Sequence, residues 1–137
     1  MTTATRRDLR ALFERYAATF ATRDVEAITA LHAEETEFRL RLDGEPARGR
    51  AGVGETFAGF FGDWPELGFE VHRVLFGDDH WVLDWAATAV LARPDGTSVP
   101  VHFDCLDVVT VDADGLVTRK DTFVDHAQLQ AALAAAA

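Results

Sequence analysis

The chain has 137 residues, of which 48% are hydrophobic and 26% are charged, and these values are typical of a folded globular protein. Its formal net charge is −10 at neutral pH, so a compact domain of this sequence repels nucleic acid and anionic membranes, and neither is expected as a partner. The single cysteine excludes an internal disulfide, and no targeting signal or apolar membrane span is visible, which together predict a cytoplasmic protein.

Three helices are predicted in the first half of the chain. Residues 5–21 carry apolar side chains at spacings of three and four, the pattern of one buried helical face, and Tyr16 lies in the middle of that face. A short helix over 24–32 follows, and Asp24 suits its N-cap position. A third helix is predicted over 51–62, although its glycines weaken it.

The remaining segments predict five strands. Apolar alternation bounded by turns rich in glycine, proline and aspartate marks strands over 37–42, 67–76, 80–92, 98–111 and 116–124. A closing helix follows Asp125, with Gln128 three residues on at the spacing of a capping box. This order predicts one α+β domain over residues 1–137, in which a curved antiparallel or mixed sheet wraps around helices and an internal pocket.

The predicted strand over 98–111 carries a carboxylate on an apolar face. Alternate residues of a strand share a face, and this face comprises Val101, Phe103, Cys105, Asp107, Val109 and Val111. A carboxylate in such surroundings must be paired, hydrogen-bonded or protonated, because an isolated buried charge costs several kcal/mol. Asp107 therefore predicts a polar site inside an apolar pocket, whereas Cys105 is expected to be an inert core thiol.

The order of the elements and several segments of the chain resemble the NTF2-like superfamily, and most closely its SnoaL-like branch. The segments that carry the resemblance are residues 16–31, 32–38, 49–61 and 114–125, so the likeness covers nearly the whole chain. It implies an NTF2-like cone, a curved sheet closing around a pocket. The superfamily includes polyketide cyclases, ketosteroid isomerases, limonene-epoxide hydrolases, dehydratases and non-catalytic binding domains, so the fold alone does not select a reaction.

The resemblance to ketosteroid isomerases suggests roles for three residues. Those enzymes use a tyrosine of the first helix and a protonated aspartic acid of a late strand as an oxyanion hole. By resemblance, Tyr16 and Asp107 occupy these two positions, and Leu40 falls where the catalytic base would be. Because leucine cannot transfer a proton, steroid isomerisation is not expected. The alternatives are that Tyr16 and Asp107 satisfy each other without a ligand, or that Asp107 caps a loop or faces an indole.

The resemblance to SnoaL-like cyclases implies a further acidic group near the end of the sheet, and Asp121 is the candidate for this general acid or base. The alternative is that Asp121 forms an ion pair with Arg119 or Lys120. The arginine and aspartate of the epoxide hydrolases fall on Trp85 and Ala87, so that enzyme's water-activating set is incomplete.

Aromatic side chains are expected to line the pocket and bind a flat hydrophobic ligand, or else to form the core; the candidates are Phe57, Phe61, Trp64, Trp85, Phe103 and Phe123. No cofactor is expected, because the glycines of 49–54 match neither a phosphate loop nor a dinucleotide fingerprint. No metal is expected either, because His102 and Asp104 lack a third ligand at a suitable spacing. Four other histidines are expected at the solvated surface: His32, His72, His80 and His126.

Two functions are consistent with these patterns. In the first, the protein is a cyclase, isomerase or hydratase that acts without a cofactor on a small hydrophobic carbonyl, polyketide or terpenoid compound. Tyr16 and Asp107 would stabilise negative charge on oxygen, and Asp121 would move the proton. In the second, the domain binds a ligand or a protein and catalyses nothing, as Leu40 at the base position suggests.

A homodimer is expected in either case, because a one-layer sheet leaves its outer face uncovered. The predicted interface row follows one face of the strand over 80–92 and consists of His80, Val82, Asp84, Ala86, Thr88 and Val90.

Overall fold

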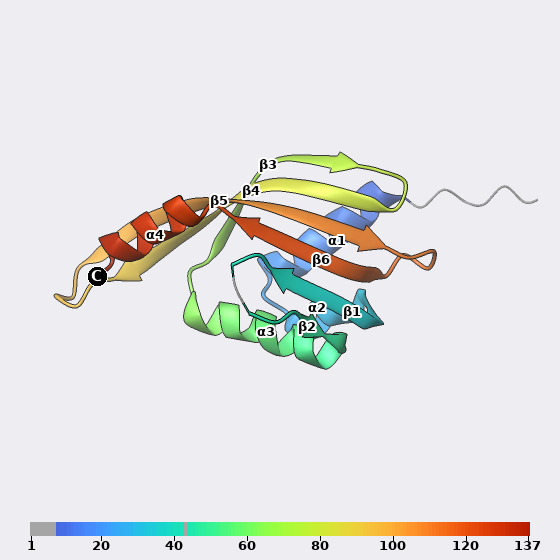
Figure 1. The fold of residues 1–137 in the computed structure, drawn as a ribbon, viewed down its shortest axis with the longest axis horizontal. Helices are drawn as coiled ribbons and strands as arrows, with labels where there is room; N and C mark the ends of the chain where they lie inside the picture. The colour runs from blue at the N-terminus through green and yellow to red at the C-terminus, as the bar shows by residue number, and fades with distance from the viewer. Residues whose placement is uncertain (1–7, 43) are drawn as a thin grey trace, which may run out of the picture.

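The computed structural model describes residues 8–42 and 44–137. In chain order the elements are α1 (Leu9–Ala21), α2 (Val25–Ala30), β1 (His32–Leu40), β2 (Ala47–Arg48), α3 (Gly49–Asp63), β3 (Gly68–Phe76), β4 (His80–Ala92), β5 (Ser98–Val111), β6 (Val117–Val124) and α4 (His126–Ala135) (Figure 1). The predicted α+β order is confirmed, and β2 is an addition to it. Residues 5–7 of the first predicted helix lie outside the described residues.

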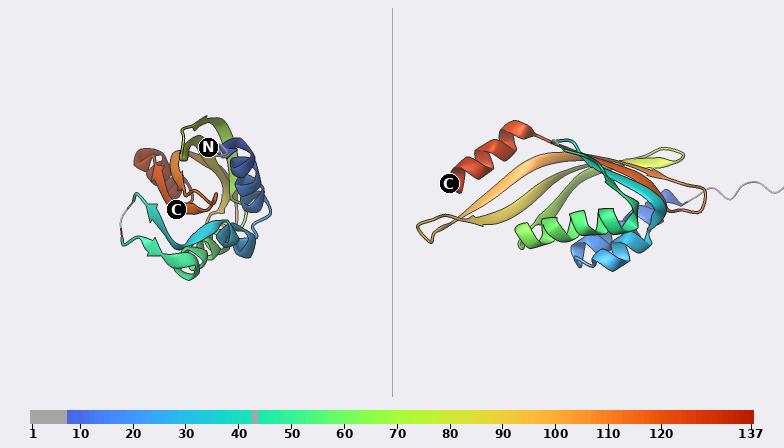
Figure 2. Two further views of the ribbon diagram at one scale, coloured as in Figure 1. Left: turned by 90° about the vertical axis from the view of Figure 1, so that its right-hand side faces the viewer. Right: turned by 60° about the horizontal axis from the view of Figure 1, so that its bottom comes forward.

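The strands form one six-stranded sheet in the order β2-β1-β6-β5-β4-β3. Its neighbouring strands are antiparallel except β1 and β6, which are parallel, so the sheet is mixed. The strand register shifts within β1, within β3 and at the end of β5 next to the turn into β6. Such irregularities bend and twist the strands, and this contributes to the curvature of the sheet. Seen along the long axis, the curved sheet and the helices α1 to α3 form a ring (Figure 2).

Local side-chain chemistry sets where the helices begin. The carboxylates of Asp8, Asp24 and Asp125 each accept a hydrogen bond from the backbone N–H three residues on, which makes them the N-caps of α1, α2 and α4. The predicted caps at Asp24 and Asp125 are therefore confirmed. Helix α3 has no such cap; it starts directly after β2 at Gly49, whose φ of 73° is a conformation that glycine adopts at little cost.

Arg23 fixes the corner between α1 and α2. It has a φ of 58°, a left-handed conformation that is uncommon outside glycine. Its guanidinium donates to the carbonyl oxygens of Trp64 and Leu67 at 3.3 and 2.8 Å, and it lies over the ring of Phe61. These contacts tie the corner to the segment that enters β3 and hold α1 and α3 against the same side of the sheet.

The inner face of β5 carries the side chains that alternation predicted. Phe103, Cys105, Asp107, Val109 and Val111 are buried, whereas the residues between them point outward and are exposed or half-buried. This face packs against α1 and α3 and forms the core with the inner face of β4. Among the described residues, no helix is long and apolar enough to cross a membrane.

Candidate functional site

A cavity of about 200 Å³ lies between the concave face of the sheet and the helices α1 and α3. Its wall is built almost wholly of aromatic and aliphatic side chains, including those that α1 and α3 project toward the sheet. Of the aromatic residues expected to line a pocket, the structure places five in this wall: Phe57, Phe61, Trp64, Trp85 and Phe103.

Phe123, the sixth of these aromatic candidates, lies on the opposite face of the sheet. Its side chain is 41% exposed, and the guanidinium of Arg41 lies 5.4 Å from its ring centroid. The reason is strand alternation: Val124 and Thr122 point into the cavity, so Phe123 between them points out.

Four lining side chains of the described residues carry an oxygen or an amine: Tyr16, Asp107, Lys120 and Thr122. Tyr16 comes from the middle of α1, and the other three come from β5 and β6. Asp107 and Thr122 are directly opposite each other in the antiparallel β5–β6 pair, and Lys120 is two residues before Thr122 on the same face. The strand register therefore gathers these groups at one place in an otherwise apolar wall.

Asp107 is buried, with 3% of its surface exposed. One carboxylate oxygen accepts a hydrogen bond from Thr122 Oγ1 at 2.8 Å, and the other lies 3.6 Å from Lys120 Nζ. A hydroxyl donor and an amine on its two oxygens suit a carboxylate that accepts hydrogen bonds. The structure thus gives Asp107 the surroundings of an acceptor, whereas the resemblance to ketosteroid isomerases implied a neutral donor.

Tyr16 is buried, and its hydroxyl lies 2.8 Å from His32 Nε2. His32 Nδ1 in turn lies 2.7 Å from Thr36 Oγ1, so the three groups form a chain that leads away from the cavity. Burial, reinforced by the nearby charge of Asp107, raises the pKa of Tyr16 well above its ordinary value. Tyr16 therefore stays a neutral phenol, and it has His32 as a partner already.

The expectation of a solvated His32 is wrong, because the side chain is fully buried. Strand β1 begins at His32, earlier than predicted, and the imidazole packs against the rings of Tyr16 and Phe57. Burial, with smaller contributions from Lys120 and Arg50, lowers the pKa of His32 to about 3. The imidazole is therefore neutral near pH 7.

Lys120 is the site residue that the sequence analysis did not identify. It is 6% exposed, and its Nζ lies 3.6 Å from Asp107 Oδ2 and 3.5 Å from the Tyr16 hydroxyl. The ammonium also faces the rings of Phe20, at 4.1 Å from the centroid, and Phe57, at 5.4 Å. Burial lowers the pKa of Lys120, and the Asp107 carboxylate opposes that shift in part.

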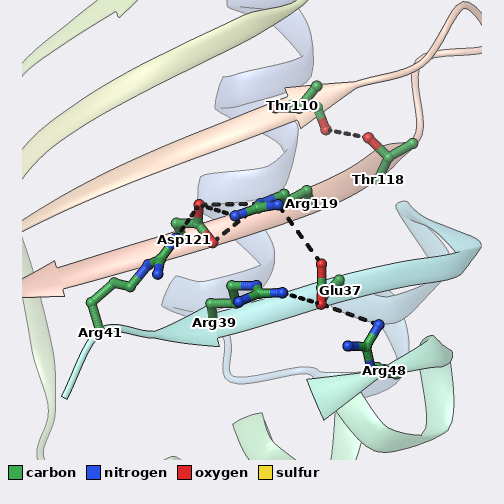
Figure 3. Close-up of polar contacts among 8 residues, drawn as sticks. All are labelled: Glu37, Arg39, Arg41, Arg48, Thr110, Thr118, Arg119 and Asp121. Atoms are coloured by element: carbon green, nitrogen blue, oxygen red, sulfur yellow. Dashed lines mark hydrogen bonds and ion pairs between the residues drawn. The ribbon is translucent and has the colours of Figure 1, made fainter. Parts of the chain in front are cut away.

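Asp121 lies on the outer face of β6, away from the cavity (Figure 3). Its carboxylate accepts from Arg119 at 3.1 Å and from Arg41 at 3.5 Å, and the same cluster includes Glu37, which pairs with Arg39 at 3.0 Å. The structure therefore brings Tyr16 and Asp107 together but not Asp121. The ion pair with Arg119, the alternative considered from sequence, is the one observed.

Two further wall residues bear on what the site can do. Leu40, at the position of the isomerase base, lines the cavity, and Asp107 is the only carboxylate in the described wall.

Trp85 is buried, and its indole N–H has no hydrogen-bond partner among the described residues. A buried donor without an acceptor is unusual in folded proteins and is a ready partner for an oxygen of a bound ligand.

Neither a metal nor a reactive thiol is indicated. The described residues contain no group of three histidine, cysteine, aspartate or glutamate side chains that could hold a metal ion. Cys105 is in the cavity wall, but burial, together with the charge of Asp107, raises its pKa to about 12, so it remains a protonated thiol.

Comparison with known proteins assigns the architecture. Residues 13–120 match the family model described as the SnoaL-like domain. A candidate SnoaL-like polyketide cyclase from Shewanella denitrificans OS-217 superposes with a TM-score of 0.80 at 10% identity, covering 94% of this chain and 99% of that one. At such identities the likeness shows the fold, and the predicted NTF2-like α+β cone is confirmed.

Two other solved structures of similar fold hold small molecules. A protein with a ketosteroid isomerase-like fold from Catenulispora acidiphila DSM 44928, in complex with trimethylamine, has a TM-score of 0.72 at 13% identity and covers 88% of this chain and 89% of that one. TerC, co-crystallised with polyporic acid, has a TM-score of 0.71 at 19% identity, covering 89% and 95%. No curated protein matches the chain in sequence.

Proposed function

The chain belongs to the SnoaL-like domain family, and from this premise we propose that it catalyses, without a cofactor, a proton transfer on a small hydrophobic carbonyl compound. The reaction would be an isomerisation, a cyclisation or a hydration. One observation carries the proposal: a carboxylate, an amine and a phenol meet on the wall of a cavity that is otherwise apolar.

Asp107 is the proposed general base, in place of Asp121, because it is the carboxylate in the described part of the wall. Its oxygens contact Thr122 and Lys120, and each keeps a lone pair that can receive a proton from the carbon next to a carbonyl group. Removing this proton places negative charge on the carbonyl oxygen, so the site also needs a donor for that oxygen.

Lys120 is the proposed donor. An ammonium has three hydrogens, and its contacts with Asp107 and Tyr16 occupy two of them, which leaves one for the ligand's oxygen. A donor aimed at developing negative charge in a site that excludes water can lower the barrier by about 3 kcal/mol. Tyr16 acts mainly as a positioning residue here, because its hydroxyl is engaged with His32 and holds Lys120 in place.

The cavity volume limits the size of the substrate. A dry apolar cavity of about 150 Å³ binds benzene in another protein, so about 200 Å³ suits one substituted ring or a short terpenoid. We propose small cyclic ketones and enals as the substrate class, held by the aromatic wall.

The test is hydrogen exchange at carbon, followed by NMR in deuterated water with 2-indanone and cyclohexenone as probes. The wild-type protein is expected to exchange the hydrogens next to the carbonyl group faster than buffer alone. Asp107→Asn should lose this activity, whereas Asp121→Asn should keep it because Asp121 lies outside the cavity. Equal exchange rates for wild type and Asp107→Asn would contradict the assignment of the base.

The second candidate function is binding without catalysis. Leu40 at the isomerase base position and the existing Tyr16–His32 hydrogen bond favour it. It predicts that the ketone probes bind, as seen by changes in the ring resonances of the cavity wall, while no hydrogen exchanges at carbon. Binding without exchange would therefore replace the proton-transfer proposal.

We also propose that the protein is a homodimer through the outer face of the sheet. Leu106 and Phe123 are opposite each other in the β5–β6 pair, and 37% and 41% of their surfaces are exposed. In the interface row expected from sequence, Val90 is 47% exposed but Ala86 in its middle is buried, so we centre the interface on the exposed apolar residues of β5 and β6. Light scattering should show a dimer that Leu106→Asp converts to a monomer; a wild-type monomer would contradict this assembly.

A further inference from the structure

We propose that Lys120 is a nucleophile, and that it forms an imine with aldehydes and ketones that enter the cavity. This inference rests on the proposed function, since it concerns the same cavity and the same class of ligand. It goes beyond that function because the carbonyl carbon would be activated by a covalent bond to Lys120, in place of the hydrogen bond from Lys120 to the carbonyl oxygen.

The composition of the chain sets Lys120 apart. The sequence contains twelve arginines and one lysine, and that lysine is the cation in the cavity wall. A guanidinium stays protonated and pairs well with carboxylates through its two-pronged geometry, so arginine would serve a purely structural ion pair with Asp107. An amine differs in that it can lose its proton and attack carbon. The one lysine of the chain therefore lies where a cation that can lose its proton meets the cavity.

The position of the amine also suits imine formation. Nζ lies 4.1, 4.9 and 5.4 Å from the ring centroids of Phe20, Tyr16 and Phe57, so hydrocarbon encloses it on several sides. A ligand in the cavity therefore meets the amine in surroundings that exclude water, and formation of an imine releases water. Burial lowers the pKa of Lys120, and Asp107 only partly opposes this, so a larger fraction of the free amine is present than on an exposed lysine.

Asp107 can carry the protons that the reaction moves. It first takes a proton from the Lys120 ammonium, 3.6 Å away, and leaves the neutral amine. The amine nitrogen bonds to the carbonyl carbon, and its surplus proton passes to the carbonyl oxygen, giving a carbinolamine. Asp107 then protonates the hydroxyl group, which leaves as water while the carbon–nitrogen double bond forms. Overall, the Lys120 ammonium and one carbonyl group give one protonated imine and one water, Asp107 ends as the carboxylate it began as, and no oxidant or reductant is needed.

The test is reductive trapping on the full-length protein. Benzaldehyde, which carries one ring, and the smaller propanal are each incubated with the protein and sodium cyanoborohydride, which reduces an imine to a stable amine. Intact mass and peptide mapping then locate the adduct. The chain offers only two primary amines, Lys120 and the N-terminal α-amine, so the latter is an internal reference in the same molecule.

The expected result is an adduct at Lys120 as well as at the α-amine. A saturating concentration of indane, a cavity ligand without a carbonyl group, should slow adduct formation at Lys120 about tenfold, the factor that corresponds to 1.4 kcal/mol of protection, and leave labelling of the α-amine unchanged. The matched control is Lys120→Arg, which keeps the charge and should label at the α-amine only. Labelling of wild type confined to the α-amine with both aldehydes would overturn the proposal.

The outcome is separable from that of the proposed function. Hydrogen exchange at carbon without an adduct at Lys120 would leave Asp107 as a base and remove the covalent step. An adduct at Lys120 without hydrogen exchange would retain the nucleophile and remove the proton transfer. Because the wild-type peptide map decides the question by itself, the proposal stays testable even if Lys120→Arg does not fold.

Discussion

The two faces of β6 carry neighbouring ion pairs in opposite surroundings. On the outer face, Arg119 pairs with Asp121 at 3.1 Å, and 43% of the Arg119 side chain but only 11% of the Asp121 side chain is exposed. On the inner face, Lys120 pairs with Asp107 at 3.6 Å, and neither side chain exceeds 7%. Solvated pairs typically contribute about 0–1 kcal/mol, because water competes for both charges. The inner pair has lost that hydration, so its members depend on each other. We therefore expect chemical reactivity from Lys120 and Asp107 on the dehydrated inner face, although the outer face of the sheet carries more charged side chains.

Removing the cation from each pair should give the largest difference. Lys120→Met leaves Asp107 buried without its partner and is expected to lower the free energy of unfolding by about 3–5 kcal/mol. Arg119→Met on the outer face should cost at most about 1 kcal/mol, since the Arg119 side chain is 43% exposed and Asp121 keeps its ion pair with Arg41. Urea denaturation measures both.

Removing both members of the inner pair sharpens this comparison. The double variant Lys120→Met, Asp107→Leu should recover much of the stability that Lys120→Met alone loses, because no charge is then left unpaired in the core. Equal losses for the inner and outer single variants would show that the inner pair is hydrated after all.

Acidification should destabilise the folded protein through the buried His32. The pKa of His32 falls from 6.5 in the unfolded chain to about 3 in the folded protein, so the unfolded state binds the proton more readily. Stability is therefore fully present above pH 6.5 and is lost as pH falls toward 3, by about 2 kcal/mol between pH 6.5 and about pH 4.5.

His32→Gln should flatten this part of the stability profile, because the group with the lowered pKa is then absent. Urea denaturation across this pH range provides the measurement. A wild-type profile with the same slope as His32→Gln would mean that His32 titrates normally in the folded protein.

Matched threonines on β6 give the next comparison. Thr122 donates to the buried Asp107 carboxylate at 2.8 Å, and Thr118 donates to the Thr110 carbonyl oxygen at 3.3 Å near the solvent (Figure 3). Hydrogen bonds to charged groups contribute more than neutral ones, so Thr122→Val should cost about 1.5 kcal/mol and Thr118→Val about 0.5 kcal/mol. Thermal unfolding at fixed pH is sufficient to rank them, and the reverse order would be incompatible with a charged Asp107.

The smallest effect is expected at the cavity wall. Trp85→Phe removes a buried N–H that has no acceptor, which offsets part of the lost packing, so stability should change by less than about 1 kcal/mol. Trp81→Phe on the same strand, where the indole packs edge-on against Phe13, should lose about 1–2 kcal/mol. Ketone affinity, measured by calorimetry, should fall for Trp85→Phe; an unchanged affinity would mean that no ligand oxygen uses this donor.

The sequence predicted strand bounds best where a run of alternating apolar and polar residues ends directly at a turn motif. The bounds of β4 and β5 agree with prediction to the residue, because the turn between them ends at Gly96, whose φ of 88° requires the conformation that glycine favours. Strand β1 was predicted to start at 37 but starts at His32. Its first residues are mostly polar, and only packing against α1 and α3 shows that this end is buried.

The same reasoning explains why the site was only partly predicted. Asp107 was identifiable because every residue that shares its face on β5 is apolar. On β6, residues 119–121 are all charged, so alternation alone does not show which of them points inward. The pairing of Thr122 with Asp107 settles the matter, and it places Lys120 inside and Asp121 outside. Such pairing depends on contacts between strands and is not visible in a single strand's sequence.

One titration tests most directly whether Lys120 is a buried, reactive amine beside Asp107. Because the chain contains one lysine, protein labelled with carbon-13 lysine gives a single side-chain ε-carbon signal. Following this signal with pH should show a midpoint below the ordinary 10.5, and the midpoint should fall further in Asp107→Asn, where the opposing carboxylate is gone. A midpoint at or above 10.5 in the folded protein would contradict the account.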